Sequence, residues 1–475
     1  MVLGIDCSRY LAEKPTGVEV YTDRLLDRLI PQADTLGYEE VRLYVKTVKQ
    51  LEKCLFLIEE SKLNNVQVRL IDHGRLWTLL WLSWEMIWRP VGKLFVPSHA
   101  MPLFFSKGSV LTVHGVEALR FPQAYSWFQR WYQSWMLKRA VRKGTEFIAV
   151  SEAVKGDVVE ILGVKEKGVR VVWNGVDREG NSKFNSAASA RVKIQNLKIS
   201  GDYVLSVGRL EERKNQLRLV EAFEVIGEEF HELKLVLVGG DGVNADLVKS
   251  KIQNSKFKNR IQVMGHQERE VVQVLMEKAA VFAYPSLAEG FGIPILEAFL
   301  ARCPVLTSIG SACEEIGGGA AVYCDPMSVD SIAEGLKKLL MDKQLRDQKV
   351  RDGKKRVDLF SWDRCVEETV KVLNAGFFFI YLLIYIHLYD YIYHMGPVKL
   401  MTNLLPDLYA FIQYEAKVQK KTMRQVLEEA SLLNMLQIRT VDMSKIKMQI
   451  GSLEEHYKRA FQQTLLVSFD VEDLF

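Results

Sequence analysis

The sequence predicts an α/β fold made of two doubly wound domains, and two observations lead to this prediction. The apolar run Val2–Ile5 is followed by a loop, by Gly17 and by an amphipathic segment that ends at Leu29. The same order of apolar run, glycine and amphipathic segment begins again at Tyr203–Val207, which leads into Gly208. Because this order opens the nucleotide-binding units of α/β proteins, its repetition indicates two such units in one chain.

Length and composition agree with this class. A chain of 475 residues is too long for a single hydrophobic core, so we expect two or three domains. The net charge of +4 is nearly balanced and gives no reason to expect a nucleic-acid partner. The six cysteines are scattered without a C-x-x-C pair, which indicates reduced thiols and a cytoplasmic location rather than disulfides or a zinc site. Met1–Ile5 is a short strand followed by Asp6, so no signal peptide is expected.

The first domain is predicted to continue with short apolar strands, and His114 directly follows one of them in the sequence T-V-H-G. Ligands bind at the carboxyl ends of strands in doubly wound sheets, so His114 is a candidate for contact with a substrate, with a structural histidine as the alternative. His99 is a weaker candidate of the same kind. Gly17 either lets the backbone approach a diphosphate or is a plain turn glycine. The expected strands are 41–45, 66–71, 94–96, 109–113, 147–150 and 169–172.

One segment of the first domain is rich in tryptophan. Trp77, Trp81, Trp84 and Trp88 follow one another at spacings of four, three and four residues, which places them on one face of a helix. We expect this helix to pack into the core. The alternative is a peripheral membrane contact, because tryptophan beside basic residues favours the bilayer interface. A second aromatic and basic helix is predicted over 121–141, where it either covers the core or faces an acceptor.

The second domain places charged residues directly after its first strand. Arg209 and Lys214 are separated by a short charged turn, so both side chains could reach one point. Two cations beside helix-end amides neutralise a diphosphate leaving group, and the alternative is a solvated charged loop. His266 follows a later strand, in a region where side-chain identity carries little information.

The most informative stretch of the second domain lies between an apolar strand and a helix that begins at Pro294. Gly290 and Gly292 break the loop before this helix, which leaves backbone N–H groups free at a helix N-terminus and makes an anion site. Glu289 on the loop and Glu297 inside the helix supply acceptors for the hydroxyls of a sugar or ribose. The residues by themselves also fit a common structural loop, and both interpretations stay open at this point.

The stretch E-G-F-G-I-P-I-L-E over residues 289–297 resembles the E-x7-E signature of the retaining glycosyltransferase family 4, which has the GT-B fold. Three further stretches resemble the family in the right order. They are T-V-H-G at 112–115, N-G-V-D at 174–177 and G-R-L-E-E-R-K-N at 208–215. The resemblance extends over residues 2–374.

The resemblance implies that a GDP- or UDP-linked sugar binds between the two domains. Arg209 and Lys214 would hold the diphosphate with the amides of the glycine loop, and Glu297 would accept from the ribose. Glu289 and His114 would contact the transferred sugar. The implied donor-binding residues are Gly17, Gly208, Arg209, Lys214, His266, Gly290, Phe291, Gly292, Ile293 and Glu297, and the implied catalytic residues are Glu289, His114, Arg209 and Lys214.

The resemblance also implies retaining transfer of a hexose, with mannose favoured, to a glycan or lipid-linked acceptor in the synthesis of cell-surface polysaccharide or glycolipid. A membrane surface is a further candidate partner. We expect no metal or other cofactor, since the first domain contains no D-x-D motif. The alternatives are a sugar-nucleotide epimerase or phosphorylase on the same fold, and a non-catalytic scaffold that binds nucleotide sugars. Consumption of donor without dependence on an acceptor would point to the first alternative.

These observations divide the chain into six parts. The last two parts lie outside the resemblance. The first of them is apolar and has three open interpretations: a membrane anchor, a packed segment, or a gene-fusion or reading-frame artefact. The second is polar. The parts are an N-terminal acceptor domain over 1–177, a linker over 178–200, a donor domain over 201–358, a helix over 359–374 that crosses back to the first domain, an apolar aromatic segment over 377–395 and a helical tail over 396–475.

Overall fold

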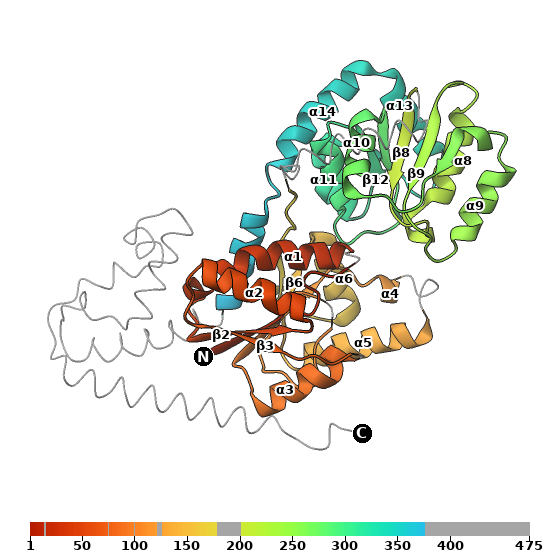
Figure 1. Cartoon of the computed structure of the whole chain (residues 1–475). Helices are drawn as coiled ribbons and strands as arrows, with labels where there is room; N and C mark the ends of the chain where they lie inside the picture. Colours follow the sequence, from red (N-terminus) through yellow and green to blue (C-terminus); the bar gives the residue numbers. More distant parts are fainter. Residues whose placement is uncertain (14–15, 75, 99, 121–125, 178–200, 376–475) are drawn as a thin grey trace, which may run out of the picture.

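The computed structural model describes residues 1–13, 16–74, 76–98, 100–120, 126–177 and 201–375 (Figure 1). His99 and the predicted parts over 178–200, 377–395 and 396–475 lie outside the described residues. Two parallel sheets, each with helices on both faces, make up the described part of the chain, as the sequence predicted.

The N-terminal half, up to residue 177, is built on a seven-stranded sheet in the order β3-β2-β1-β4-β5-β6-β7, with every pair parallel. The central strands are continuous apolar runs because both of their faces are covered. The strands are β1 (Val2–Asp6), β2 (Glu40–Val45), β3 (Val66–Leu70), β4 (Lys93–Val96), β5 (Val110–Val113), β6 (Glu146–Ala149) and β7 (Val169–Val171). The helices are α1 (Gly17–Leu29), η1 (Ile30–Leu36), α2 (Val48–Glu60), η2 (Trp77–Leu82), α3 (Ser83–Trp88), α4 (Glu117–Arg120), α5 (Trp127–Arg142), α6 (Glu152–Leu162) and η4 (Glu166–Gly168).

The C-terminal half, from residue 201 to 358, is built on a six-stranded parallel sheet in the order β10-β9-β8-β11-β12-β13. Strand β8 lies between β9 and β11, so the loops that follow β8 and β11 are neighbours at one edge of the sheet. The strands are β8 (Tyr203–Val207), β9 (Lys234–Val238), β10 (Ile261–Val263), β11 (Val281–Tyr284), β12 (Val305–Ser308) and β13 (Val322–Cys324). The helices are η5 (Glu212–Lys214), α8 (Gln216–Ile226), α9 (Ala245–Asn254), η6 (Lys258–Arg260), α10 (Arg269–Lys278), α11 (Ile293–Leu300), α12 (Ala312–Gly317), η7 (Gly318–Ala320), α13 (Val329–Met341) and α14 (Lys343–Val357).

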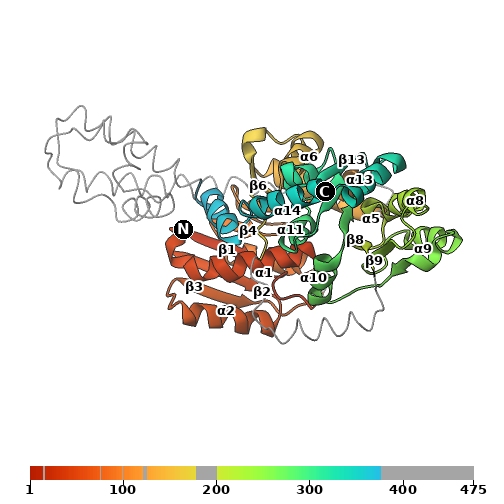
Figure 2. The same cartoon turned by 90° about the horizontal axis from the view of Figure 1, so that it is seen from above.

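Hydrophobic contacts show which helices cover which face. In the N-terminal half, α1 and α2 pack on one face of the sheet, and α3, α5 and α6 pack on the other. In the C-terminal half, α8, α9 and α13 cover one face, and α10, α11, α12 and α14 cover the other. One hydrophobic cluster contains the second face of both sheets and passes through Phe291 and Phe360, so the two halves share a core where they meet (Figures 1 and 2).

The last described helix, over 362–375, returns to the N-terminal half. Trp362 and Leu373 are buried in the cluster that contains α1 and α2. The carbonyl oxygen of Leu373 accepts hydrogen bonds from the Tyr38 hydroxyl at 2.7 Å and from the Lys93 ammonium at 2.9 Å. The described end of the chain is therefore fixed to the first sheet.

The expectation of a core helix for the tryptophan-rich segment is wrong for three of its four tryptophans. Trp77 is buried, but Trp81, Trp84 and Trp88 are 38%, 58% and 67% exposed. The segment is also divided, because the π-helix η2 ends at Leu82 and α3 continues from there. Aromatic residues at helical spacing share one face, but this spacing is the same whether the face is buried or exposed.

Three further features of the described residues bear on the expectations. All six cysteines are free thiols in the structure, and all six are buried. No helix among residues 1–375, apart from the gaps in the description, is long and apolar enough to cross a membrane. Within the same described residues, no group of three or more His, Cys, Asp or Glu side chains is arranged to hold a metal ion.

Candidate functional site

The glycine-broken loop lies between β11 and α11, at the carboxyl edge of the second sheet. Gly292 is the N-cap of α11 and has a φ of 102°, a left-handed conformation that glycine adopts without a steric penalty. Pro294 is in the first turn of the helix, where its missing N–H is not needed. The backbone amides from Gly290 to Ile293 therefore gather at a helix N-terminus, which favours an anion.

Glu289 is the centre of a buried ionic cluster on this loop. One carboxylate oxygen accepts from the Lys214 ammonium at 2.7 Å, and the other accepts from the Arg213 guanidinium at 3.0 Å. Arg213 also donates to the carbonyl oxygen of Ala288 at 3.0 Å and to the carboxylate of Glu211 at 2.8 Å. The loop after β8 is therefore bound to the loop after β11 through two cations.

This cluster changes the acid strength of its members. Burial alone would raise the pKa of Glu289, but Lys214 and Arg213 outweigh it and lower the pKa to about 2. Tyr284 lies below the cluster, and its hydroxyl accepts from Lys214 at 2.6 Å. Burial raises the pKa of Tyr284 well above its usual value, and the charge of Glu289 adds to this effect. At neutral pH the site therefore holds an ionised carboxylate, two cations and a neutral phenol.

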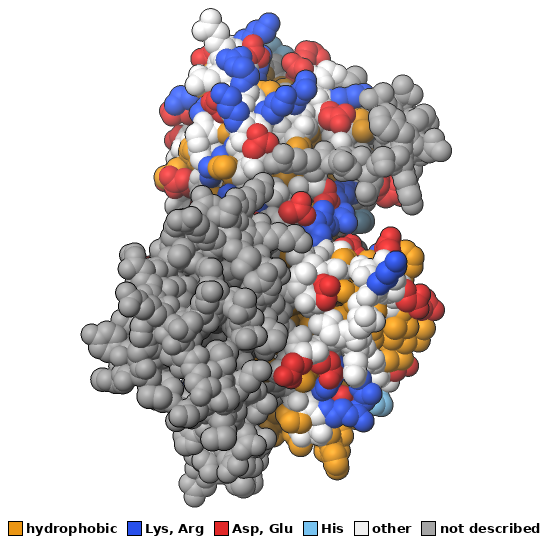
Figure 3. All heavy atoms as spheres, turned by 90° about the vertical axis from the view of Figure 1, so that its left-hand side faces the viewer, with side chains coloured by type: hydrophobic (Ala, Val, Ile, Leu, Met, Phe, Trp, Pro, Cys, Tyr) orange, Lys and Arg blue, Asp and Glu red, His pale blue; other side chains and the backbone are white. Residues whose placement is uncertain are grey.

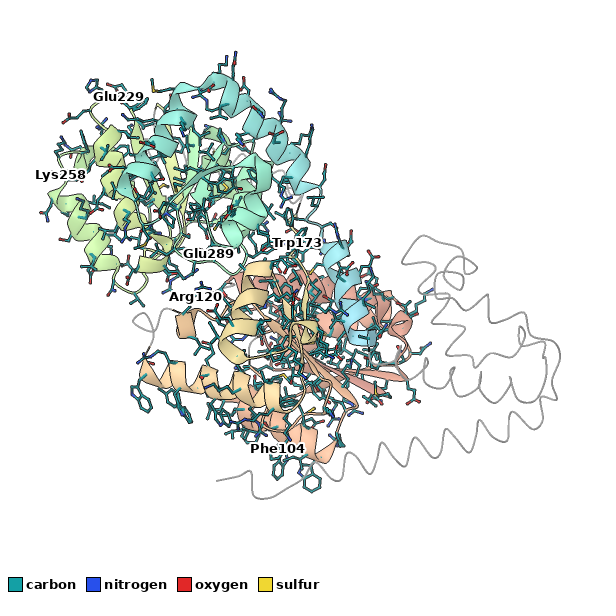
Figure 4. The ribbon with its side chains drawn as sticks, turned by 180° about the vertical axis from the view of Figure 1, so that it is seen from behind. Phe104, Arg120, Trp173, Glu229, Lys258 and Glu289 are labelled. Atoms are coloured by element: carbon teal, nitrogen blue, oxygen red, sulfur yellow. The ribbon has the colours of Figure 1, made fainter. Side chains whose placement is uncertain are left out.

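The loop also contacts the N-terminal half. A methyl group at Gly290 would lie 1.7 Å from the carbonyl oxygen of His114, so the approach of these two segments requires glycine. The Ser151 hydroxyl donates to the carbonyl oxygen of Gly290 at 2.7 Å. Ser151 is also the N-cap of α6 and accepts from the Val154 amide. Figure 4 shows Glu289 at the boundary between the two halves.

His114 lies on the other side of this boundary, directly after β5. Its Nε2 atom is 2.9 Å from the carbonyl oxygen of Pro97. A carbonyl oxygen can only accept, so Nε2 carries the hydrogen in this arrangement. The imidazole ring also makes an edge-to-face contact with Tyr21, with ring centroids 4.6 Å apart. Both contacts fix the ring orientation beside the glycine loop.

Glu297 belongs to a second ionic group that joins the two halves. Burial raises the pKa of Glu297, although 28% of its side chain remains exposed, and Arg269 at 3.5 Å opposes this rise. Arg269 also bonds Asp177 at 3.2 Å, and Asp177 bonds Arg24 of α1 at 2.8 Å. The carboxylate expected to accept from ribose is therefore linked through three ion pairs to the first helix of the chain.

The remaining predicted residues are spread more widely. The Arg209 guanidinium is exposed and donates to the carbonyl oxygen of Asp241 at 3.1 Å, so it and Lys214 bind different partners in this structure. Gly208 packs against the Lys214 side chain, with an added methyl group 3.4 Å from its carbons. Gly17 opens α1 and is exposed, with nothing within 4 Å of an added methyl group, and His266 is exposed after β10.

Two residues of the site were not predicted from the sequence. Arg213 was treated as part of a charged turn, and only its position beside Lys214 pointed to the cluster. Glu315 of α12 accepts from the Trp173 indole at 2.6 Å and from the Glu152 amide at 2.8 Å, at the N-terminus of α6. Nothing in the sequence pattern signalled this contact, which joins the two halves.

Two family models match the chain. The model described as "Glycosyl transferases group 1" matches residues 191–356, which contain the Glu289 cluster. The model described as "Glycosyltransferase Family 4" matches residues 61–179, which contain His114 and Ser151. The two matches lie on opposite sides of the boundary at which the site is built.

The chain is also similar to curated enzymes. It is 25% identical over 264 residues to the O-antigen chain mannosyltransferase B of Escherichia coli. This match covers 55% of this chain and 69% of that protein. It is 27% identical over 222 residues to an N-acetylgalactosaminyltransferase of Campylobacter jejuni that is named for a diphospho-undecaprenol acceptor. This second match covers 46% of this chain and 56% of the relative, so only about half of the relative's length is spanned.

Solved structures show the same fold. The Anabaena protein HepE in complex with UDP and glucose has a TM-score of 0.57 at 16% identity, covering 79% of this chain and 100% of that chain. WaaG, a glycosyltransferase involved in lipopolysaccharide biosynthesis, has a TM-score of 0.58 at 16% identity, covering 78% of this chain and 99% of that chain. At this level of identity the likeness concerns the fold.

Proposed function

Because the chain belongs to the group 1 glycosyltransferases and has their GT-B fold, we propose that it transfers a hexose from a nucleoside-diphosphate sugar to a glycan or lipid-linked acceptor. The observation that carries this proposal is the pair Lys214 and Glu289 beside the N-terminus of α11, on the loop whose Gly290 lies against the backbone of His114 in the other half. This arrangement supports an anion site beside a carboxylate that is proposed to bind the sugar.

The diphosphate is proposed to bind between Lys214, Arg209 and the amides that open α11. An ammonium group has three donors, and Glu289 and Tyr284 use two of those of Lys214, which leaves capacity for a phosphate oxygen without breaking the present pairs. The exposed Arg209 can leave the carbonyl oxygen of Asp241 at small cost, because an exposed hydrogen bond is readily exchanged with water. Positive charge would then be concentrated where the leaving group develops negative charge.

The sugar is proposed to lie between Glu289 and His114, and the ribose beside Glu297. We propose that the acceptor hydroxyl attacks the anomeric carbon on the face from which the diphosphate leaves, so that the new bond retains the anomeric configuration. The bond from the anomeric carbon to the phosphate oxygen breaks with its electron pair, and the departing oxygen takes the proton of the hydroxyl. No covalent sugar–enzyme intermediate is required in this sequence.

The identity of the donor is proposed from the chain's similarity to known proteins. A mannosyltransferase is among the relatives, and a UDP complex is among the structures of the same fold. We propose a hexose carried by GDP or UDP, with mannose favoured. The cations of the site are proposed to take the place of a metal ion, so that EDTA should leave turnover unchanged.

Thermal denaturation of the full chain tests donor binding. A ligand that binds only the folded protein raises its melting temperature by mass action, so GDP, UDP and their hexose derivatives can be compared directly. We expect one nucleotide series to raise the melting temperature and Arg209→Ala to abolish the rise. If none of these nucleotides raises the melting temperature, the proposed donor site is refuted.

Turnover tests the chemistry. Arg209→Ala and Lys214→Ala should each lower the release of nucleoside diphosphate in the presence of acceptor by about a hundredfold or more, since both remove charge stabilisation. Lys258→Ala is the matched control, because Lys258 is an exposed lysine of the same half that Figure 4 shows far from Glu289. Release that requires no acceptor would favour an epimerase or phosphorylase, and binding without release would favour a scaffold.

A further inference from the structure

Exposed aromatic side chains lie along α3 and the turn before it. Trp81, Trp84 and Trp88 are 38%, 58% and 67% exposed, and their spacing of three and four residues places them on one side. Trp84 and Trp88 contact each other with ring centroids 5.7 Å apart. Ile87, also exposed, lies between them in the sequence. A soluble domain rarely exposes so many large apolar side chains together unless the surface binds something.

A second aromatic row runs along α5. Trp127, Trp131 and Trp135 lie four residues apart and are 70%, 54% and 36% exposed. The rings of Trp131 and Trp135 stack with centroids 6.2 Å apart, and Phe128 contacts both Trp127 and Trp131 at 6.1 Å. The Arg139 guanidinium lies 5.9 Å from the Trp135 ring. The exposed row is therefore continuous over more than two turns of helix.

The two aromatic rows form one surface because a single loop joins them. The Leu103 amide donates to the Ser83 hydroxyl of α3 at 2.7 Å. The carbonyl oxygen of the same residue accepts from Arg139 of α5. Figure 4 shows Phe104, the next residue of this loop, between the two helices on the side away from the C-terminal half. We call the exposed residues of η2, α3 and α5 the aromatic surface.

The aromatic surface is also positively charged. The chain contains no Asp or Glu between Ala118 and Thr145. The exposed cations Lys138 and Arg142 continue the face of α5 on which the tryptophans lie. The basic residues between the same limits are Arg120, Arg130, Lys138, Arg139, Arg142 and Lys143.

On the α3 side, the single carboxylate of Ser83–Trp88 is neutralised by two arginines. Glu85 bonds Arg69 at 3.3 Å and Arg89 at 3.4 Å. The side chains of these two arginines are 38% and 53% exposed, whereas that of Glu85 is 13% exposed, so the arginines contribute more of the charge that solvent meets. Figure 3 shows hydrophobic and basic side chains together at the end of the N-terminal half that points away from the C-terminal half.

We propose that the aromatic surface binds an anionic lipid bilayer. Tryptophan rings prefer the interface between headgroups and acyl chains, and arginine and lysine are attracted to anionic lipids over the same depth. A protein partner would require an acidic, shape-matched surface, whereas a bilayer accommodates two helices with outward tryptophans without a defined pocket. The surface lies away from the Glu289 cluster, so binding there leaves the boundary between the halves accessible (Figure 4).

Sedimentation of the full chain with vesicles tests this proposal. Vesicles of phosphatidylcholine with phosphatidylglycerol are compared with vesicles of phosphatidylcholine alone. We expect binding to the anionic vesicles, and a loss of about tenfold or more in partitioning for Trp84→Ala/Trp88→Ala, because each ring contributes buried apolar area. Lys138→Gln/Arg142→Gln should lower partitioning to anionic vesicles by a similar factor and be nearly silent without phosphatidylglycerol.

The matched control is Leu55→Ala/Phe56→Ala on α2, which removes two exposed apolar side chains (43% and 56%) outside the aromatic surface. This control should bind vesicles as the natural chain does. Equal binding by the tryptophan variant, or no binding by the natural chain, would overturn the proposal. Light scattering adds a further outcome, since a dimer that dissociates in the tryptophan variant would assign the surface to a second copy of this chain. A melting temperature like that of the natural chain verifies that each variant is folded.

Discussion

Replacement of Glu289 by glutamine removes the carboxylate that Lys214 and Arg213 share. The pKa of Glu289 is about 2 in the folded protein against an ordinary value of 4.5. This difference corresponds to about 3 kcal/mol of stability, at ~1.4 kcal/mol for each pKa unit. The Glu289 side chain is only 8% exposed, so solvent screens this contribution little. Glu289→Gln also leaves the largely buried Lys214 ammonium without a carboxylate, whereas Arg213 keeps Glu211, and the loss at Lys214 acts in the same direction.

Hydrogen exchange measured by mass spectrometry is the appropriate assay, because all nine tryptophans lie outside residues 201–358 and none of them belongs to the loop that carries Glu289. Peptides covering 281–300 should lose about a hundredfold in protection at neutral pH, since a factor of ten corresponds to ~1.4 kcal/mol. Glu212→Gln is the control, because Glu212 is an exposed carboxylate of the same charged loop. A change below about threefold in Glu289→Gln, or an equal change in the control, would refute the reasoning.

The dependence on pH has a defined sign. The folded-state pKa of Glu289 lies below the unfolded value, so the contribution is complete above about pH 4.5 and is lost as the pH falls toward 2. The difference in protection between the natural chain and Glu289→Gln should therefore be constant from pH 7 to 5 and shrink below that range. A difference that stays constant under more acidic conditions would mean that Glu289 stabilises the loop through its shape rather than its charge.

Two further changes test how the halves meet. Gly290→Ala places a methyl group 1.7 Å from the carbonyl oxygen of His114 and should lower transfer to the acceptor while a nucleoside diphosphate still raises the melting temperature, whereas Gly319→Ala, which meets nothing within 4 Å, should leave both unchanged. Glu315→Gln weakens the bond to the Trp173 indole and should increase the radius of gyration measured by small-angle X-ray scattering; an unchanged profile would show that this contact does not hold the halves together.

The sequence was sufficient for the architecture because the central strands of both sheets, such as Val110–Val113 and Tyr203–Val207, are short buried runs of mainly apolar residues with glycine or a polar residue directly after them. It was not sufficient for the ionic pairing at Glu289. The bonds of Glu289 to Lys214 and Arg213 exist because β8 lies beside β11, although the two strands are separated in the chain by β9 and β10. Strand order is a property of the whole sheet, so a motif read along the chain shows two charged loops without showing that they touch.

The tryptophans illustrate a second limit. Trp84 and Trp88 have the spacing of a helical face, and this spacing led to the expectation of a core helix. In the structure Trp84 and Trp88 are 58% and 67% exposed, because no other described element covers that side of the helix. Helical periodicity gives the angle between side chains, whereas exposure depends on what the rest of the fold places opposite them.

The arrangement of contacts around the glycine loop separates two steps of the proposed reaction. Lys214 and Glu289 belong to the same half and stay together whether or not the halves are closed. The contacts from Ser151 and His114 come from the other half and exist only when the halves meet as they do here. In the proposed reaction the diphosphate therefore needs only groups of the C-terminal half, whereas the surroundings of the sugar also need groups of the N-terminal half. A closure of the two halves on the bound donor would then exclude water from the sugar and place His114 beside it at the same time.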